Sequence, residues 1–121
     1  DFDINAGGTL TILEELRSQS NPPGILYTST NKVYGALGDV SLHAHWNRYE
    51  PDDREVATSG ISEQRPLAAY TPYGCSKAAA DSYVLDYGRS FGIPAVVFRM
   101  SCIYGPRQFG TEDQGWLAHF L

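Results

Sequence analysis

The stretch Thr71-Pro72-Tyr73-Gly74-Cys75-Ser76-Lys77 opens an apolar segment that runs to Phe91, and the run AVVFRM follows it at residues 95–100. Thr71 is a good helix N-cap and Pro72 suits a first helical turn, so the sequence predicts a helix from here to about Phe91. The short β-branched run at 95–100 is typical of a buried strand. A helix followed by a strand is therefore the unit from which we build the fold.

The same unit occurs once more, upstream. Residues 2–19 place most of their apolar side chains on one stripe, which predicts an amphipathic helix, and residues 25–30 (ILYTST) are typical of a second buried strand. Residues 31–70 carry several Gly and Pro with little periodicity, and we expect mostly loop there. A loop this long usually binds or covers a ligand. Residues 101–115 also read as loop, and a last helix is expected to begin near Trp116.

This alternation of helices and strands predicts an α/β fold in which right-handed crossovers join parallel strands. Ligands of such sheets bind beyond the carboxyl ends of the strands. Several reactive or polar side chains fall at that edge, at the ends of the two strands and at the start of the helix between them: Ser29, Thr30, Tyr73, Lys77, Ser101 and Cys102. The sequence therefore predicts a site that polarises a C–O group.

Tyr73 and Lys77 are the strongest candidates for chemistry. Residues four apart on a helix share one face, with Cβ atoms about 5–6 Å apart. A free tyrosine, with a pKa of about 10, is a poor base near neutral pH, and a cation held beside a phenol favours its ionised form. The pair suggests proton transfer at a hydroxyl or carbonyl. The spacing alone is equally compatible with a core tyrosine beside a solvated lysine.

Length and composition exclude several classes of protein. A chain of 121 residues makes one domain at most, and its net charge of -5, without long runs of one sign, argues against nucleic acid or a membrane as partner. No apolar stretch approaches the roughly 20 residues that cross a bilayer. Cys75 and Cys102 lack metal-type spacing and are too few for a disulfide framework, so we expect a soluble, cytoplasmic protein with free thiols.

A metal site is not expected. His43 and His45 form a pair that could bind a metal, but no third ligand lies nearby in sequence. We also expect Trp116 and Phe120 to pack in the core rather than to form a stacking platform. Because the chain starts at Asp1 within a predicted helix and ends at Leu121 within an apolar run, we expect an internal piece of a longer protein.

The motifs together resemble a known family. Thr28-Ser29-Thr30 running into Val33-Tyr34-Gly35, then Tyr73-Gly-Cys-Ser-Lys77, Phe98-Arg99 and Tyr104-Gly105-Pro106 resemble, in order, the extended short-chain dehydrogenase/reductases. These are NAD-dependent epimerases and dehydratases of nucleotide sugars. The strings TSTNKVYG at 28–35 and RQFGTEDQGW at 107–116 are most similar to the CDP-tyvelose (CDP-paratose) 2-epimerases. The resemblance implies that residues 1–121 form part of a Rossmann-like three-layer αβα domain with parallel strands, lacking its N-terminal glycine-loop half.

The resemblance also implies roles for individual residues. Tyr73 would be the catalytic base and acid, Lys77 would support it and hold the nicotinamide ribose, and Thr30 would bind the reacting sugar hydroxyl. The other cofactor-binding positions that it implies are Asn5, Thr28, Ser29, Met100 and Ser101. The further substrate-binding positions that it implies are Lys32, Cys102, Arg107 and Gln108. Arg107 suits a diphosphate because a guanidinium can bind phosphate oxygens bidentately.

The implied function is epimerisation of a nucleotide sugar through transient oxidation of a hydroxyl-bearing carbon, with NAD as a bound cofactor. Within the family, UDP-glucose 4-epimerase and a 4,6-dehydratase are alternatives; the dehydratase is disfavoured because Asn31 and Lys32 follow Thr30 where an acidic pair is expected. These 121 residues contain no glycine-rich phosphate loop, so the span alone is expected to be inactive.

An alternative of another class is a non-catalytic fold fragment or dimerisation module. In extended relatives the helices that correspond to 2–19 and 73–91 pack across a two-fold axis, which implies a homodimer. Tyr83, Leu85 and Tyr87 are the candidate dimer surface, and ordinary packing onto the sheet is the other interpretation of these three side chains.

Overall fold

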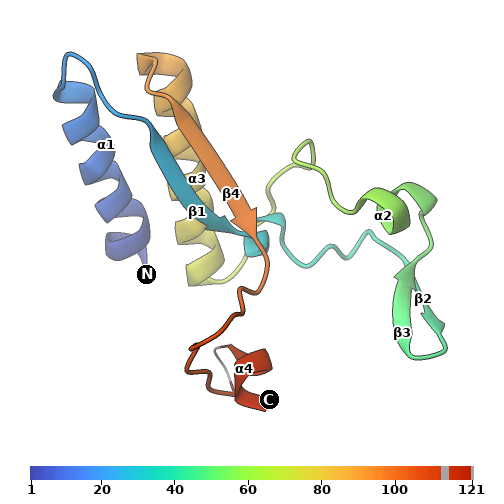
Figure 1. Ribbon diagram of the computed structural model, residues 1–121. Helices are drawn as coiled ribbons and strands as arrows, with labels where there is room; N and C mark the ends of the chain where they lie inside the picture. The colour runs from blue at the N-terminus through green and yellow to red at the C-terminus, as the bar shows by residue number, and fades with distance from the viewer. Residues whose placement is uncertain (113–114, 121) are drawn as a thin grey trace.

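A computed structural model describes residues 1–112 and 115–120 of the chain (Figure 1). Leu121, in the apolar run at the end of the chain, lies outside the described residues. The first predicted helix is present as a π-helical segment, η1 (Asp3–Gly7), that continues into α1 (Gly8–Ser18). The helix opened by the Tyr73 stretch is α3 (Pro72–Phe91), and the last one is α4 (Trp116–Phe120). These helix predictions are confirmed to within a few residues.

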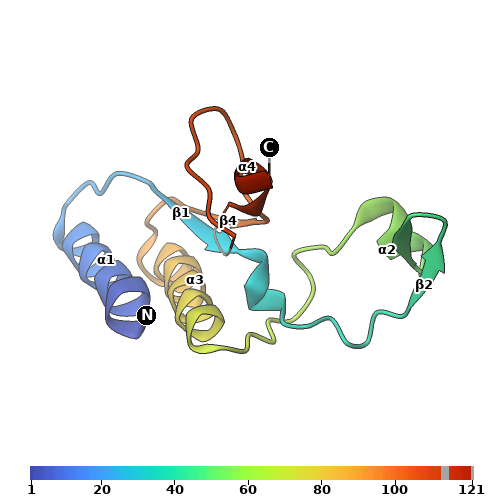
Figure 2. The same ribbon diagram turned by 90° about the horizontal axis from the view of Figure 1, so that it is seen from below.

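The two predicted strands, β1 (Ile25–Thr30) and β4 (Ala95–Met100), form a parallel sheet. Their register runs from Ile25 opposite Ala95 to Thr30 opposite Met100, so both strands end at the same level. Helices α1 and α3 lie side by side on one face of this sheet, as the view from below shows (Figure 2). The carboxyl ends of both strands thus meet at one edge, where the fold class places a ligand.

The core lies between the sheet and the two helices. Leu13 of α1 packs against Val84 and Tyr87 of α3 and against Ile93, which leads into β4. Leu13, Val84 and Ile93 are almost completely buried, and burial of such side chains stabilises a fold by about 1.5–3 kcal/mol each. Because Tyr87 is in this core, it is not part of an exposed dimer surface, and the packing interpretation holds for that residue.

The opposite face of the sheet is bare in the described residues. Leu26, Val96 and Phe98 point to that side and are 60%, 50% and 48% exposed. The described residues therefore supply two of the three expected layers, the sheet and one helical layer, together with the helix α4 beyond the strand ends (Figure 1).

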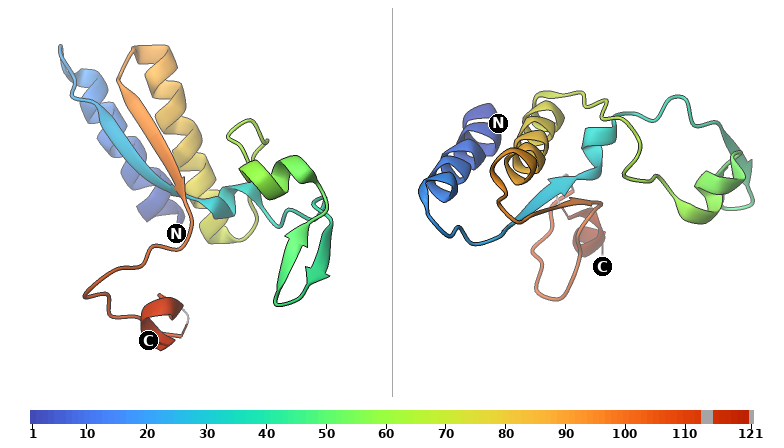
Figure 3. Two further views of the ribbon diagram at one scale, coloured as in Figure 1. Left: turned by 45° about the vertical axis from the view of Figure 1, so that its right-hand side comes forward. Right: turned by 90° about the horizontal axis from the view of Figure 1, so that it is seen from above.

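The prediction of mostly loop at 31–70 is wrong in part. A 3-10 turn, η2 (Asn31–Tyr34), follows β1 directly, and the chain then forms an antiparallel hairpin of β2 (Leu42–His45) and β3 (Arg48–Pro51) and a short helix, α2 (Arg54–Ser59). The hairpin and α2 project from the body as an arm (Figure 3). Most side chains of the hairpin are exposed, so its strands lack the apolar alternation by which a strand is predicted.

Local signals explain where α3 begins and ends. The hydroxyl of Thr71 accepts a hydrogen bond from the Gly74 amide at 3.2 Å, which is the N-cap contact that the sequence predicts. At the other end, Gly92 adopts a left-handed conformation with φ +70°. Tyr73 is thereby placed in the first turn of α3, facing the strand ends. No helix in the described part of the chain is long and apolar enough to span a membrane.

Candidate active site

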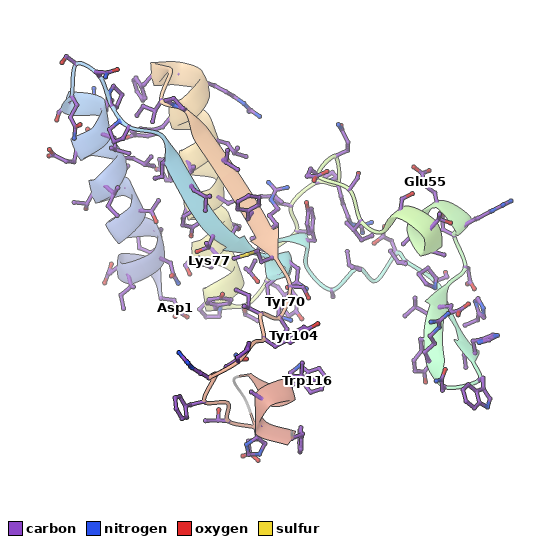
Figure 4. All side chains as sticks on the ribbon, in the orientation of Figure 1. Asp1, Glu55, Tyr70, Lys77, Tyr104 and Trp116 are labelled. Atoms are coloured by element: carbon purple, nitrogen blue, oxygen red, sulfur yellow. The ribbon has the colours of Figure 1, made fainter. Side chains whose placement is uncertain are left out.

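A cleft of about 710 Å³ opens at the carboxyl ends of β1 and β4. Its walls come from the two strand ends, η2, the first turns of α3 and the segment before α4. Figure 4 labels Lys77 beside the strand ends and Trp116 at α4, which lies beyond them. The residues that line the cleft are Thr28, Ser29, Thr30, Asn31, Lys32, Tyr73, Lys77, Met100, Ser101, Cys102, Ile103, Gln108, Gly115 and Trp116. Nearly all of the predicted site residues therefore line this cleft. The exceptions are Asn5 and Arg107.

Lys77 is anchored to the sheet. Its Nζ donates a hydrogen bond to the Thr28 carbonyl at 2.6 Å and lies 4.5 Å from the centre of the Tyr27 ring. An ammonium carries three donors, so the Thr28 contact leaves capacity for a ligand. Tyr73, one turn earlier on the same helix, is 44% exposed and lines the same cleft. The Lys77 ammonium and the Tyr73 phenol therefore line the same cleft. A backbone carbonyl, that of Thr28, holds the ammonium in place.

Thr30 lines the cleft and is 9% exposed. Its Oγ1 accepts a hydrogen bond from the Lys32 amide at 3.3 Å, so it caps η2. The cap also orients the hydroxyl: Oγ1 donates to Asn31 Oδ1 at 3.4 Å, a long bond that a better acceptor in the cleft can replace. Thr30 is thus a structural cap whose oxygen is also within the candidate site.

Ser29 lines the cleft and also makes a contact within the protein. Its hydroxyl donates to Asp81 Oδ2 on α3 at 2.8 Å. Asp81 is fully buried and also accepts two hydrogen bonds from Arg99, each at 2.9 Å. Arg99 in turn donates to the Tyr34 hydroxyl at 2.9 Å. The hydrogen bonds with Asp81, and then that with Tyr34, raise the pKa of Arg99 above its ordinary value, so it stays charged.

Asp81 is the important residue that sequence reasoning missed. The available signal was its position four residues after Lys77, which puts a carboxylate on the helix face that also carries Tyr73 and Lys77. The local sequence pattern does not show which groups Asp81 binds, because its partners Ser29 and Arg99 are 52 and 18 residues away in the chain.

Asn5 lies behind the cleft. Its Nδ2 donates to the Ser76 hydroxyl at 3.1 Å, and that hydroxyl donates to the Tyr73 carbonyl at 2.8 Å. Asn5 therefore links η1 to the first turn of α3, and the structure places its side chain against protein rather than in the cleft.

The segment after β4 forms the outer wall. Cys102 is exposed and lines the cleft, and the Gln108 amide donates to the Ile103 carbonyl at 3.2 Å. Trp116 lines the cleft and is 53% exposed, and Phe120 is 74% exposed, so the prediction that both pack in the core is wrong.

Comparison with known proteins agrees with this geometry. A profile of the NAD dependent epimerase/dehydratase family matches residues 1–121. The chain belongs to this family. It is 49% identical over 120 residues to CDP-paratose 2-epimerase from Salmonella typhi, an alignment that covers 99% of this chain and 35% of the relative.

Two solved structures share its fold. One is dTDP-glucose 4,6-dehydratase from Bacillus anthracis in complex with NAD, with a TM-score of 0.66 and 32% identity over 89% of this chain and 29% of the other. The second is UDP-glucuronic acid 4-epimerase from Bacillus cereus in complex with NAD, with a TM-score of 0.63 and 25% identity over 91% of this chain and 28% of the other. The chain thus spans about a third of the length of the relatives it matches.

Proposed function

We propose that the protein is an NAD-dependent nucleotide-sugar epimerase whose reaction is that of CDP-paratose 2-epimerase. The observation that carries this proposal is the placement of Tyr73, Lys77 and Thr30 around one cleft at the ends of two parallel strands. The 49% identity to a CDP-paratose 2-epimerase favours this reaction over others of the family.

The residues of the cleft fit NAD. The volume of the cleft, about 710 Å³, is within the range of roughly 300–1,000 Å³ that is typical of small-molecule sites. Lys77 and Tyr73 supply an ammonium and a phenol that can bind ribose hydroxyls, and Thr28, Met100 and Ser101 lie beside them. When bound, NAD supplies the reversible hydride transfer that the side chains cannot perform.

The side chains supply the proton chemistry. The C–H bond at C2 of the sugar is not acidic, so inversion there requires oxidation of that same carbon. Tyr73 takes the proton of the C2 hydroxyl as the carbon is oxidised, and returns it when the carbon is reduced on its opposite face. Thr30 donates a hydrogen bond to the same oxygen. Lys77 stabilises the negative charge on the phenol.

Replacement of Tyr73 tests this role directly. We expect Tyr73→Phe to lower kcat by about 10²–10⁴-fold, because the group that transfers the proton is lost while the ring remains. The assay uses a longer version of the protein that includes a glycine-rich loop and follows interconversion of CDP-paratose and its C2 epimer. Bound NAD is measured by absorbance after protein denaturation. Tyr49→Phe, on the exposed hairpin, is the matched control. Turnover within a few-fold of the control would remove Tyr73 from the mechanism.

The 4,6-dehydratase alternative is disfavoured by the side chains beside Thr30. Elimination of water needs an acid and a base near the departing hydroxyl. Asn31 and Lys32 occupy that position, and no carboxylate lines the cleft among the described residues. Incubation with CDP-paratose, UDP-glucose and dTDP-glucose in parallel separates 2-epimerase, 4-epimerase and dehydratase activity. If the longer protein that includes a glycine-rich loop turns over none of the three, the non-catalytic alternative is favoured.

We further propose that the protein forms a homodimer through α1 and α3. Ile12 of α1 and Tyr83 and Phe91 of α3 are 56%, 45% and 49% exposed, and such side chains would be covered by a second copy. Light scattering on wild type and Tyr83→Glu tests this, since a dimer through these helices should dissociate in the variant.

The cytoplasm is the proposed compartment, because Cys75 and Cys102 are both free thiols.

A further inference from the structure

We propose that Asp81 is a positioning residue: its buried carboxylate clips α3, which carries Tyr73 and Lys77, to the ends of β1 and β4. The clip consists of Asp81, Ser29 and Arg99, and none of these three transfers a proton in the reaction proposed above. The geometric part of the inference stands independently of that reaction; its consequence for turnover rests on the proposed function.

The carboxylate binds both strands at one level. Asp81 Oδ2 accepts from Ser29 Oγ at 2.8 Å and from Arg99 Nε at 2.9 Å, and Oδ1 accepts from Arg99 Nη2 at 2.9 Å. Ser29 and Arg99 are register partners across the parallel sheet. One carboxylate therefore joins the two strands directly before Thr30 and Met100, the residues at which they end.

The clip extends to the turn that carries Lys32. Arg99 Nη1 donates to the Tyr34 hydroxyl at 2.9 Å, and the guanidinium lies 5.2 Å from the centre of the Tyr34 ring. Tyr34 is buried at the end of η2. Through Arg99, Asp81 thus holds four elements that line the cleft: α3, β1, β4 and η2.

A second contact sets the register of α3 on β1. Lys77 donates to the carbonyl of Thr28, and Asp81, one turn later on the helix, binds the next residue of the strand, Ser29. Two successive turns of α3 are therefore tied to two successive residues of β1. A slide of the helix would break both contacts and would move Tyr73 relative to Thr30.

The buried ion pair is better explained by geometry than by stability. Asp81 is fully buried and the side chain of Arg99 is 14% exposed. Replacing such a pair by apolar side chains of similar volume is often neutral or stabilising, because removal of the charges from water is costly. What the pair provides is a bidentate contact with one allowed orientation.

The apolar replacement separates these two contributions. We would compare wild type, Asp81→Leu/Arg99→Met and the control Asp86→Asn, which changes an exposed carboxylate of the same helix that accepts from Ser90. The readouts are thermal unfolding and hydrogen exchange at residues 28–30 and 98–100, with α1 as internal reference. The third readout is kcat per folded molecule, measured with the same substitutions in a longer version of the protein that includes a glycine-rich loop.

We expect the double variant to unfold near the wild-type temperature, to exchange faster at the two strand ends but not in α1, and to lose kcat by about 100-fold, the typical cost of a 1 Å misplacement. Unchanged exchange at the strand ends, or an unchanged kcat per folded molecule, would overturn the proposal. If the wild-type form of the longer protein that includes a glycine-rich loop turns over none of the three nucleotide sugars, the proposed function fails, while the exchange comparison still decides the clip. Should the double variant not fold, Asp81→Glu keeps the charge but lengthens the clip, and the same shifts are expected from it.

Discussion

At the scale of single residues, Lys77 shows how a side chain gains a role from its surroundings. Its ammonium is held by the Thr28 carbonyl and by the face of the Tyr27 ring. Both contacts hold the positive charge beside the cleft, and no carboxylate lines the cleft among the described residues. The charge can therefore interact with a ligand or with the hydroxyl of Tyr73, which lines the same cleft.

Loss of that charge should affect the reaction more than the fold. We expect Lys77→Met to lower kcat by at least about 10²-fold, because the proton-transfer group loses its supporting cation. The unfolding temperature should change little, since the long apolar stem is preserved. Steady-state kinetics and thermal unfolding check this, with Lys32→Met as a control for a cation elsewhere in the cleft. Equal losses in both variants would mean that the cleft needs only net positive charge.

Glu14 provides a pH-dependent contact between α1 and α3. Its carboxylate accepts hydrogen bonds from Arg17, at 3.0 and 2.6 Å, and from the Tyr87 hydroxyl. These bonds, that with Arg17 first, lower the pKa of Glu14 from 4.5 to about 2. A lowered folded-state pKa stabilises the fold above the unfolded-state value, and this contribution is lost as pH falls through the folded-state value.

Between pH 4.5 and 2, wild type should therefore lose more unfolding free energy than Glu14→Gln, which cannot titrate there. Above pH 4.5 the two curves should run parallel. Urea unfolding at a series of pH values measures the difference. Parallel curves over the whole range would show that the contact does not depend on the carboxylate charge.

At the scale of elements, the turn after η2 depends on Gly35. Its φ of +75° is a backbone conformation that residues other than glycine rarely adopt, and a Cβ placed there would clash with the backbone carbonyl of Ala68. The Ala68 amide donates to the Val33 carbonyl at 3.0 Å, so the returning loop is held against η2 at this point. The close approach of Gly35 and Ala68 therefore fixes where the chain returns to η2 after the arm of β2, β3 and α2.

Gly60 offers a matched comparison, because it has φ +76° but open space where a Cβ would be. We expect Gly60→Ala to cost about 1–3 kcal/mol from backbone strain alone. Gly35→Ala should cost more, since the clash with Ala68 adds to the same strain. Chemical unfolding of both variants checks the order; a Gly35→Ala variant as stable as Gly60→Ala would mean that the loop moves freely.

At the scale of the whole molecule, the proposed function requires the described residues to build only one wall of the NAD site. The cleft offers Tyr73, Lys77 and the strand ends, but the 121 residues contain no glycine-rich loop at a helix N-terminus, the usual site of pyrophosphate binding. If the proposed function is correct, affinity for the cofactor and geometry for the chemistry are provided by different parts of the fold.

We expect the 121-residue chain by itself to show no saturable NAD⁺ binding below about millimolar concentration, because most phosphate contacts are missing. Isothermal calorimetry with NAD⁺ is the measurement, and a longer version of the protein that includes such a loop is the positive control. Micromolar affinity of the 121-residue chain would show that the cleft alone holds the cofactor.

The sequence by itself determined the local elements and their order. Thr71, Pro72 and Gly92 mark the ends of α3, the apolar runs mark β1 and β4, and the four-residue spacing of Tyr73 and Lys77 sets them on one face, since all of these signals act within a few residues.

Only the tertiary structure decided which distant groups meet. The bonds of Asp81 to Ser29 and Arg99, of Lys77 to the Thr28 carbonyl, and the exposure of Trp116 in the cleft each depend on how separate elements pack. Local periodicity reports which face of an element is buried, but not which residue lies opposite it, because that is set by register and packing across the whole core.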